Sequence, residues 1–217
     1  MHLDFRHITT WVFDLDHTLY PPEAGLFALM EPRLSDWIMT ALQIDRPRAD
    51  HLRQHYWHTY GTTLAGLMAE HNVDPAPYLT HVHDIPLASL TPDPALAAAI
   101  ANLPGRRIVF TNGPHAYAQK VLAARGLTAA FDAVYGVEQA GFHPKPSQHA
   151  FDTVFALDGL IPATAAMFED DPRNLTIPRA LGMQTILIGP TAHPDVHHHA
   201  TDLTHFLQMI TAASHAA

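Results

Sequence analysis

Short apolar runs alternate with longer amphipathic segments over the second half of the chain. The candidate strands cover residues 8–13, 107–110, 133–135, 165–168 and 185–188. The candidate helices begin near Asp93, His115, Ser147 and Pro172, and Gly126 and Gly182 stand where two of them would end. Because such alternation is typical of βαβ units, the sequence predicts an α/β fold with a Rossmann-like, doubly wound parallel sheet.

A helical pattern fills the interval between the first two candidate strands. Apolar residues recur at three to four residue spacing from Leu26 to Leu42, where Pro32 is expected to kink or divide the helix, and the pattern resumes from Leu52 to Met68. Prolines mark a turn-rich return path, at Pro75, Pro77, Pro86, Pro92 and Pro94. We therefore expect a core domain of residues 1–20 and 91–217 and a helical cap domain of residues 21–90. Such an insert would lie over the carboxyl ends of the strands, where open α/β sheets bind ligands.

Composition narrows the classes of partner and compartment. The 217-residue chain has a formal net charge of −9, which argues against nucleic acid or an anionic membrane as the main partner. The absence of cysteine excludes disulfides, thiolate zinc sites and thiol nucleophiles, and it favours the cytoplasm. The amino-terminal residues lack an apolar leader, and no stretch reaches the roughly 18 apolar residues of a membrane span.

Polar side chains stand at the carboxyl ends of the candidate strands. In chain order they are Asp14 and Asp16, Thr111 and Asn112, Lys145 before a helix, and Asp170 and Asp171. Any one set has an ordinary explanation, such as a turn, an exposed lysine or a helix cap. Together, at successive strand ends, they predict one polar site at one edge of the sheet.

The segments FDLDHTLY, FTNG, KP and FEDDPRN resemble the four motifs of the haloacid dehalogenase superfamily. The resemblance implies a Mg²⁺-dependent phosphatase that works through a phosphoaspartate, with a small helical cap between the first and second motifs. The segments HYWHTYGTTLAGL, HVHDIPL and TNGPHAYAQKVLAARGL are similar to the pyrimidine 5′-nucleotidase branch.

This resemblance implies a role for each carboxylate of the first motif. Asp14 would be the nucleophile, since a carboxylate can attack a phosphoryl group covalently. Asp16 would protonate the leaving oxygen and then deprotonate the attacking water. In an extended segment these two side chains share one side, and Leu15 faces the core. An acid at position 16 favours phosphoryl transfer over carbon–halogen cleavage.

The remaining motifs imply a cation and a phosphate site. Mg²⁺ would be held by Asp14, by the backbone carbonyl of Asp16 and by an acid of the fourth motif. The fourth motif offers two such acids, Asp170 and Asp171. We expect Asp171 to be the cation ligand, with Asp170 as a direct ligand or as a supporting partner. Lys145 would neutralise Asp14 and the transferring oxygens. Phosphate would be bound by the Thr111 hydroxyl and the amides of Asn112 and Gly113.

The expected partner is a small phosphorylated metabolite, foremost a pyrimidine nucleoside 5′-monophosphate. The protein itself is expected to be a monomer or a homodimer. A phosphatase for sugar phosphates or phosphoglycolate, or a phosphomutase, is the alternative on the same fold. A third hypothesis, from a different class, is a nucleotide-binding protein without turnover. Against it stands the complete motif set, because a non-catalytic relative has no need to keep Asp16.

Other residues have two open interpretations. His17 would contact phosphate or only shape its turn, and the segment HPDVHHHATD is expected to be a solvated loop rather than a metal site. We expect four aromatic residues to form cap core rather than a base-stacking platform: Trp37, Tyr56, Trp57 and Tyr60. Four arginines of the insert are expected to be mostly surface residues, with contact of one of them to a substrate phosphate or base as the alternative: Arg33, Arg46, Arg48 and Arg53.

Overall fold

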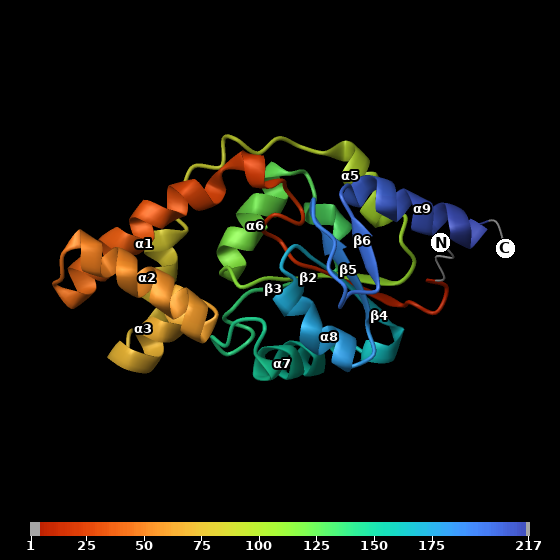
Figure 1. The fold of residues 1–217 in the computed structure, drawn as a ribbon. Coiled ribbons are helices and arrows are strands. Elements are labelled where there is room, and N and C mark those ends of the chain that lie inside the picture. The colour runs from red at the N-terminus through yellow and green to blue at the C-terminus, as the bar shows by residue number, and fades with distance from the viewer. Residues whose placement is uncertain (1–4, 216–217) are drawn as a thin grey trace.

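A computed structural model describes the fold of residues 5–215. Its described strands form one parallel sheet in the order β3-β2-β1-β4-β5-β6 (Figure 1). The strands are β1 (Thr10–Phe13), β2 (Arg106–Phe110), β3 (Ala133–Tyr135), β4 (Ala165–Glu169), β5 (Gln184–Ile188) and β6 (His198–Ala200). The central strand β1 lies between β2 and β4, so the chain order reverses there. An open α/β sheet places its ligand site at such a reversal.

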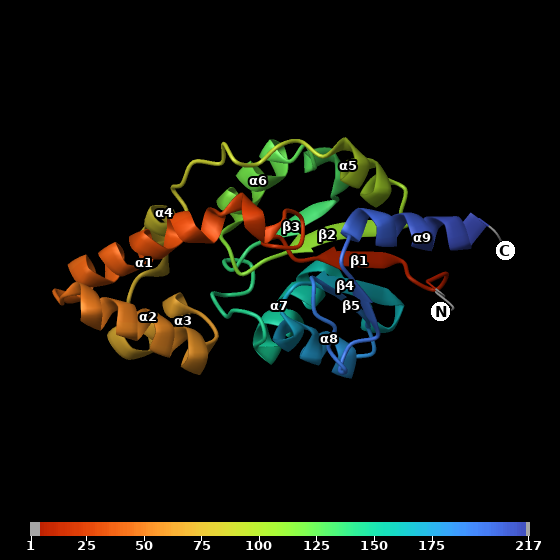
Figure 2. The same cartoon turned by 45° about the horizontal axis from the view of Figure 1, so that its top comes forward.

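Helices cover both faces of the sheet. They are α5 (Pro94–Ala101), α6 (His115–Ala124) and α9 (Leu203–His215) on one face, and α7 (Gln148–Asp158) and α8 (Thr176–Ala180) on the other (Figure 2). Short 3₁₀ turns complete the core as η1 (Pro22–Ala24), η2 (Thr128–Ala130), η3 (Pro162–Thr164) and η4 (Pro172–Leu175). This architecture confirms the predicted doubly wound α/β fold.

Burial on both faces explains why the strands read as continuous apolar runs. In β1, Trp11 and Phe13 face the cluster under α5, α6 and α9, whereas Val12 faces the cluster under α7. Phe13 stacks on Phe168 of β4 with ring centroids 4.5 Å apart. The middle of the sheet is therefore rigid, which fixes the residues that follow each strand.

The interval after β1 is helical, as expected. It forms α1 (Leu26–Leu42), α2 (Arg46–Tyr60), α3 (Thr63–His71) and α4 (Pro75–Val82), and we call residues 26–82 the helical insert. These helices pack on one another and lie beside the core, beyond one end of the sheet (Figures 1 and 2).

The prolines differ in part from the expectations. Of the two outcomes expected at Pro32, a kink or a division, the structure excludes the division, because α1 continues through this residue. Proline removes the hydrogen bond to the carbonyl four residues earlier, and that residue, Ala28, is exposed, so water can satisfy its carbonyl. The return path is not only turns, because Pro75 and Pro77 lie in the first turn of α4. There Asp74 caps the helix by accepting a hydrogen bond from the amide of Ala76 at 3.0 Å.

The expectation for the histidine-rich segment holds for residues 193–197, which form a mostly exposed loop, and is corrected for residues 198–200, which belong to the sheet. Residues 198–200 form β6, which pairs in parallel with β5. The His198 ring packs against Phe5 and Phe206, with centroid distances of 5.1 and 6.0 Å. His199 Nε2 lies 2.7 Å from the Gly189 carbonyl oxygen. These histidines therefore stabilise the sheet edge.

Helix ends agree with the sequence in most places. The Asp93 side chain accepts from the amide of Leu96 at 2.9 Å and caps α5. Ser147 stands at the N-cap of α7 without a side-chain capping bond. Over the described residues, every helix is too short or too polar to cross a membrane.

Candidate active site

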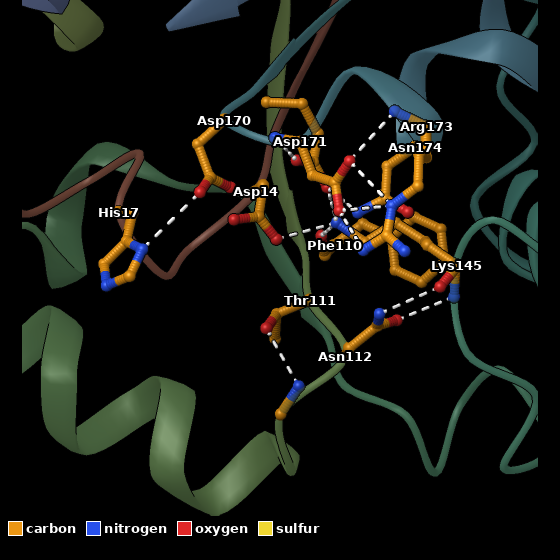
Figure 3. A network of polar contacts seen from close by, with 12 residues as sticks. Asp14, His17, Phe110, Thr111, Asn112, Lys145, Asp170, Asp171, Arg173 and Asn174 are labelled. Atoms are coloured by element: carbon orange, nitrogen blue, oxygen red, sulfur yellow. Dashed lines mark hydrogen bonds and ion pairs between the residues drawn. The ribbon is translucent and has the colours of Figure 1, made fainter. Parts of the chain in front are cut away.

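The polar sets that follow the strands meet at one cleft. Asp14, Asp16, Thr111, Lys145 and Asp170 all line it, and its volume is about 710 Å³. Adjacent parallel strands end at the same edge of a sheet, so β1, β2 and β4 bring their following residues together. The helical insert supplies the opposite wall. Figure 3 shows the polar network on the core side.

Lys145 is the central cation of the network. Its Nζ donates to Asp14 Oδ1 at 2.7 Å, to Glu169 Oε1 at 2.7 Å and to the Phe110 carbonyl at 2.9 Å. These three acceptors use all three protons of an ammonium. Burial disfavours the charged form, yet the two carboxylates outweigh burial and raise the pKa of Lys145. The lysine is therefore a fixed positive charge beside Asp14.

Asn112 positions this lysine through the backbone. Its Oδ1 accepts from the Lys145 amide at 2.7 Å, and its Nδ2 donates to the Lys145 carbonyl at 3.1 Å. The side chain thereby connects the end of β2 to the loop that carries the lysine.

Thr111 and Gly113 contact each other. The Gly113 amide donates to Thr111 Oγ1 at 3.0 Å, and both residues line the cleft. Because Thr111 Oγ1 accepts this bond, its own proton is left for an acceptor in the cleft.

A group of carboxylates lies next to Lys145. Asp14, Glu169 and Asp170 each offer an oxygen within 4.8 Å of the others, which makes them the candidate metal site among the described residues. Burial raises the pKa of Asp14 well above its ordinary value, against the opposing effect of Lys145, and the neighbouring carboxylates raise it further. Like charges at this spacing need a nearby cation.

Glu169 was missed by the sequence analysis, which ended the strand at Phe168. It is the last residue of β4 and is fully buried. Besides Lys145 it receives the Asn174 side chain at 2.7 Å and the Asp171 amide at 2.9 Å. The available signal was an acid directly after the buried run AAMF, because a carboxylate there requires a partner.

The structure places Asp170, rather than Asp171, next to Asp14. Asp171 lies outside the carboxylate group because Arg173 holds it, with Nε and Nη2 at 2.9 and 2.6 Å from Oδ2. It also caps η4 through the Arg173 amide at 3.0 Å. Burial acts to raise the pKa of Asp171, but the bonds to Arg173 outweigh burial and lower it. The sequence-based preference for Asp171 as the cation ligand therefore lacks support in this geometry.

His17 shapes the turn and contacts Asp170. Its φ of 62° is in the left-handed region, and its Nδ1 lies 3.5 Å from Asp170 Oδ2. This carboxylate raises the pKa of His17. The ring also packs on Phe27 of α1 with centroids 4.7 Å apart.

Asp16 is held by two phenols. Its Oδ1 accepts from the Tyr20 hydroxyl at 2.5 Å and from the Tyr117 hydroxyl at 3.0 Å. Burial raises the pKa of Asp16, and the two hydroxyls oppose that rise. The carboxylate itself is half-buried and lines the cleft.

All four helices of the insert contribute to the insert wall of the cleft, and Trp57 of α2 is one of its exposed aromatic residues. Trp57 was expected in the core of the insert and is instead 46% exposed, with the Arg173 guanidinium over its ring at 4.3 Å from the centroid. The other three aromatic residues pack into the core of the insert, as predicted, namely Trp37, Tyr56 and Tyr60.

Of the four arginines considered, Arg53 is the one that lines the cleft. Its Nη1 lies 3.2 Å from Glu31, and its Nε is buried with no hydrogen-bond partner within the described part of the chain. Arg33 instead donates to the His81 carbonyl at 2.7 Å, and Arg46 pairs with Asp36.

Residues 8–182 match the haloacid dehalogenase-like hydrolase family. The chain belongs to this family. The match spans all four motifs and the whole helical insert, so the expected superfamily resemblance is confirmed.

A curated relative of this hydrolase has low sequence identity to it. Phosphate metabolism protein 8 of Saccharomyces cerevisiae is 27% identical over 191 residues, which are 81% of this chain and 60% of the yeast protein. The chain thus spans less than two thirds of that relative.

Solved structures agree on the fold of this hydrolase. A haloacid dehalogenase phosphatase from Thermococcus onnurineus is 18% identical, covers 94% of this chain and 98% of its own, and has a TM-score of 0.64. The putative hydrolase YfnB from Bacillus subtilis, bound to magnesium, is 16% identical with the same coverages and a TM-score of 0.59.

Proposed function

We propose that this hydrolase removes phosphate from a small phosphomonoester, with Asp14 as the nucleophile and a pyrimidine nucleoside 5′-monophosphate as the substrate. The observation that carries the proposal is the pair of carboxylates on one cleft, Asp14 held by Lys145 at 2.7 Å and Asp16 held by two hydroxyls. One carboxylate has a cation beside it, as a nucleophile for an anionic phosphate requires. The other carboxylate, Asp16, lines the cleft and has no cation bonded to it among the described residues, so it can give and take a proton there as an acid and base.

Each step follows from the residues present. An oxygen of Asp14 forms a bond to phosphorus while the bond from phosphorus to the ester oxygen breaks, and Asp16 gives that oxygen a proton. A water then gives a proton to Asp16, attacks phosphorus and releases Asp14. The fixed charge of Lys145 stabilises the negative charge that moves onto the transferring oxygens. Carbon–halogen cleavage would not need the acid Asp16, so its presence favours phosphoryl transfer.

The carboxylates fit a divalent cation. Asp14, Glu169 and Asp170 lie together, and Lys145 is bonded to two of them, so negative charge is in excess. Oxygen donors of this kind suit Mg²⁺. In the proposal Asp14 and Asp170 hold the ion, and Glu169 supports them through Lys145. The bound ion would neutralise phosphate oxygens and the excess carboxylate charge.

The insert wall supports a substrate with a flat ring. A cleft of about 710 Å³ is in the usual range for small-molecule sites, and the partly exposed Trp57 lies in its lining. The Trp57 ring carries a planar group, the Arg173 guanidinium, 4.3 Å from its centroid. In this proposal a pyrimidine base stacks on the ring in place of the guanidinium. Arg53, whose Nη1 lies 3.2 Å from Glu31, lines the same wall, and in this proposal it is the insert arginine that faces the substrate. In this proposal the helical insert acts as a cap that excludes water.

The test is phosphate release from a panel of esters with Mg²⁺ and with EDTA. The panel contains UMP, CMP, AMP, glucose 6-phosphate and phosphoglycolate, and Asp14→Asn is the matched inactive variant. We expect metal-dependent release that prefers UMP or CMP and is lost in Asp14→Asn. Preference for a sugar phosphate or phosphoglycolate would keep the chemistry and overturn the substrate. Full activity of Asp14→Asn would overturn the mechanism.

A further inference from the structure

Two tyrosines from different elements hold the same oxygen of Asp16. Tyr20 follows β1, Tyr117 lies in α6, and both are almost fully buried at 2% and 3% exposure. Their hydroxyls lie 2.5 and 3.0 Å from Asp16 Oδ1 and 3.3 Å from each other. Each phenol has one proton to donate, and the shorter contacts go to the carboxylate.

The backbone is arranged to bring these rings together. The Leu19 amide donates to the Leu15 carbonyl at 2.9 Å, which closes one helical turn and places Tyr20 above Asp16. Gly113 leaves room for the other ring, because a Cβ there would be 3.1 Å from Tyr117 Cδ1. The arrangement therefore depends on two separate segments of the chain, the turn after β1 and the loop that leads from β2 into α6.

We infer that Tyr20 and Tyr117 are positioning residues that fix which oxygen of Asp16 exchanges protons with the substrate. In the neutral acid, a half-turn about the last torsion of the aspartate costs little and would move the proton from one oxygen position to the other. Two hydroxyl donors at the Oδ1 position disfavour that turn, because it would point the carboxyl O–H at them, and they leave Oδ2 as the oxygen that carries the proton. Within the described part of the chain, Oδ2 has no hydrogen-bond donor.

This inference rests on the proposed phosphatase function and gives it an atomic detail. In the first step the proton moves from Asp16 Oδ2 to the ester oxygen as the bond from phosphorus to that oxygen breaks. In the second step Oδ2 takes a proton from the attacking water. A purely structural role for the phenols would instead affect all substrates alike.

The test compares two esters that differ in their need for a proton. The ribose oxygen of UMP leaves as a strongly basic alkoxide unless it is protonated, whereas the nitrophenolate of p-nitrophenyl phosphate leaves without help. We expect Tyr117→Phe and Tyr20→Phe each to lower kcat/KM for UMP by roughly 10- to 100-fold, part of the usual contribution of acid catalysis. For p-nitrophenyl phosphate we expect a change of no more than about 3-fold, because that ester needs little acid catalysis.

The matched control is Tyr135→Phe. It also removes a phenol that donates to a carboxylate, Asp158 Oδ1 at 2.8 Å, but it lies outside the cleft lining. We expect it to leave the ratio of the two kcat/KM values unchanged. Each variant loses one oxygen and keeps its ring, and the thermal midpoint confirms folding.

A double variant tests whether the phenols act through Asp16. The Asp16→Asn enzyme releases the first product without completing turnover, so the ratio is measured there from the single-turnover rates of uridine and nitrophenolate release. Adding Tyr117→Phe in this background should not change that ratio, because the acid is already lost. A ratio unchanged in the single tyrosine variants, or changed as much in the Asp16→Asn background as in the enzyme with Asp16, would overturn the inference. A wild type that hydrolyses neither ester would overturn the proposed function itself, and the inference with it.

Discussion

At the residue scale, three consecutive acids have three different environments. Glu169 is buried against Lys145, Asp170 lies with Asp14 and His17, and Asp171 is bonded to Arg173. Neighbouring residues after a strand point in different directions, so adjacent carboxylates with the same chemistry need not share a function. The contacts assign Asp170 to the carboxylate group and Asp171 to a helix cap.

We predict opposite results for Asp170→Ala and Asp171→Ala. Removing Asp170 should raise the Mg²⁺ concentration needed for half-maximal activity by at least about tenfold, since it takes away a proposed ligand oxygen. Removing Asp171 should leave that concentration unchanged and lower the free energy of unfolding by about 0.5–2 kcal/mol, as lost caps do. Magnesium titrations of activity and urea unfolding separate the two effects. A metal requirement that depends on Asp171 and not on Asp170 would contradict this assignment.

At the element scale, α2 and β6 show what the helical insert and the sheet edge contribute. Helix α2 turns Tyr56 into the insert and Trp57 toward the cleft, since consecutive helical residues point about a quarter-turn apart. Strand β6 extends the sheet with two histidines that are partly covered by aromatic rings and loops. We therefore expect α2 to affect substrate choice and β6 to affect stability.

For α2 we predict that Trp57→Ala weakens binding of the base. Loss of one stacking partner costs about 1–3 kcal/mol, so KM for UMP should rise about tenfold or more with little change in kcat. Ribose 5-phosphate lacks the base, so its inhibition constant should not change. Trp57→Phe, which keeps a ring, should recover most of the loss. An equal weakening of both ligands would show that Trp57 only supports the fold.

For β6 we predict a loss of stability in mild acid. Burial lowers the pKa of His197 and His198 below 6.5 in the folded state. The unfolded chain then binds more protons below about pH 6.5, so stability is full above that pH and falls as the pH falls toward the folded values. His198→Phe keeps a ring against Phe5 and Phe206 and removes one such group. Its thermal midpoint should therefore fall less than that of the wild type between pH 7.5 and 5.5, each about one unit from the ordinary histidine pKa.

The control for this prediction is His205→Phe, at an exposed position of α9. It should follow the wild-type pH dependence. If His198→Phe loses as much stability in acid as the wild type, the buried histidine does not cause the loss.

At the scale of the whole molecule, the sequence was sufficient for the sheet and insufficient for its details. The strands β1, β2, β4 and β5 are buried on both faces and read as apolar runs, whereas β6 reads HHA and has too few apolar side chains to be recognised. Helix α4 begins with two prolines, which the sequence analysis interpreted as turns. The β6 error concerns an element that tertiary contacts stabilise more than its local pattern does. For α4 a local signal was present, because Asp74 followed by Pro75 is a common pair of N-cap and first helical residue.

The site, like the fold, was predicted from the sequence in part. Asp14, Asp16, Thr111, Asn112, Lys145 and Asp170 all line one cleft, because strand ends are fixed by the fold. Glu169 was missed although an acid directly after a buried run is a signal in the sequence, and the two tyrosines were not found because their roles depend on their partners in space. Tyr117 is one hundred and one positions from Asp16 in the chain, and only packing brings it there.

The central claim is that Asp14 becomes covalently phosphorylated, and trapping that intermediate tests it most directly. Asp16→Asn should still react with p-nitrophenyl phosphate, which needs no acid, but it lacks the base that activates water for release. We predict a burst of nitrophenolate equal to the enzyme concentration and one added phosphoryl group on the peptide that contains Asp14. Phosphate release with no modified enzyme, or a phosphoryl group on a different residue, would contradict the account.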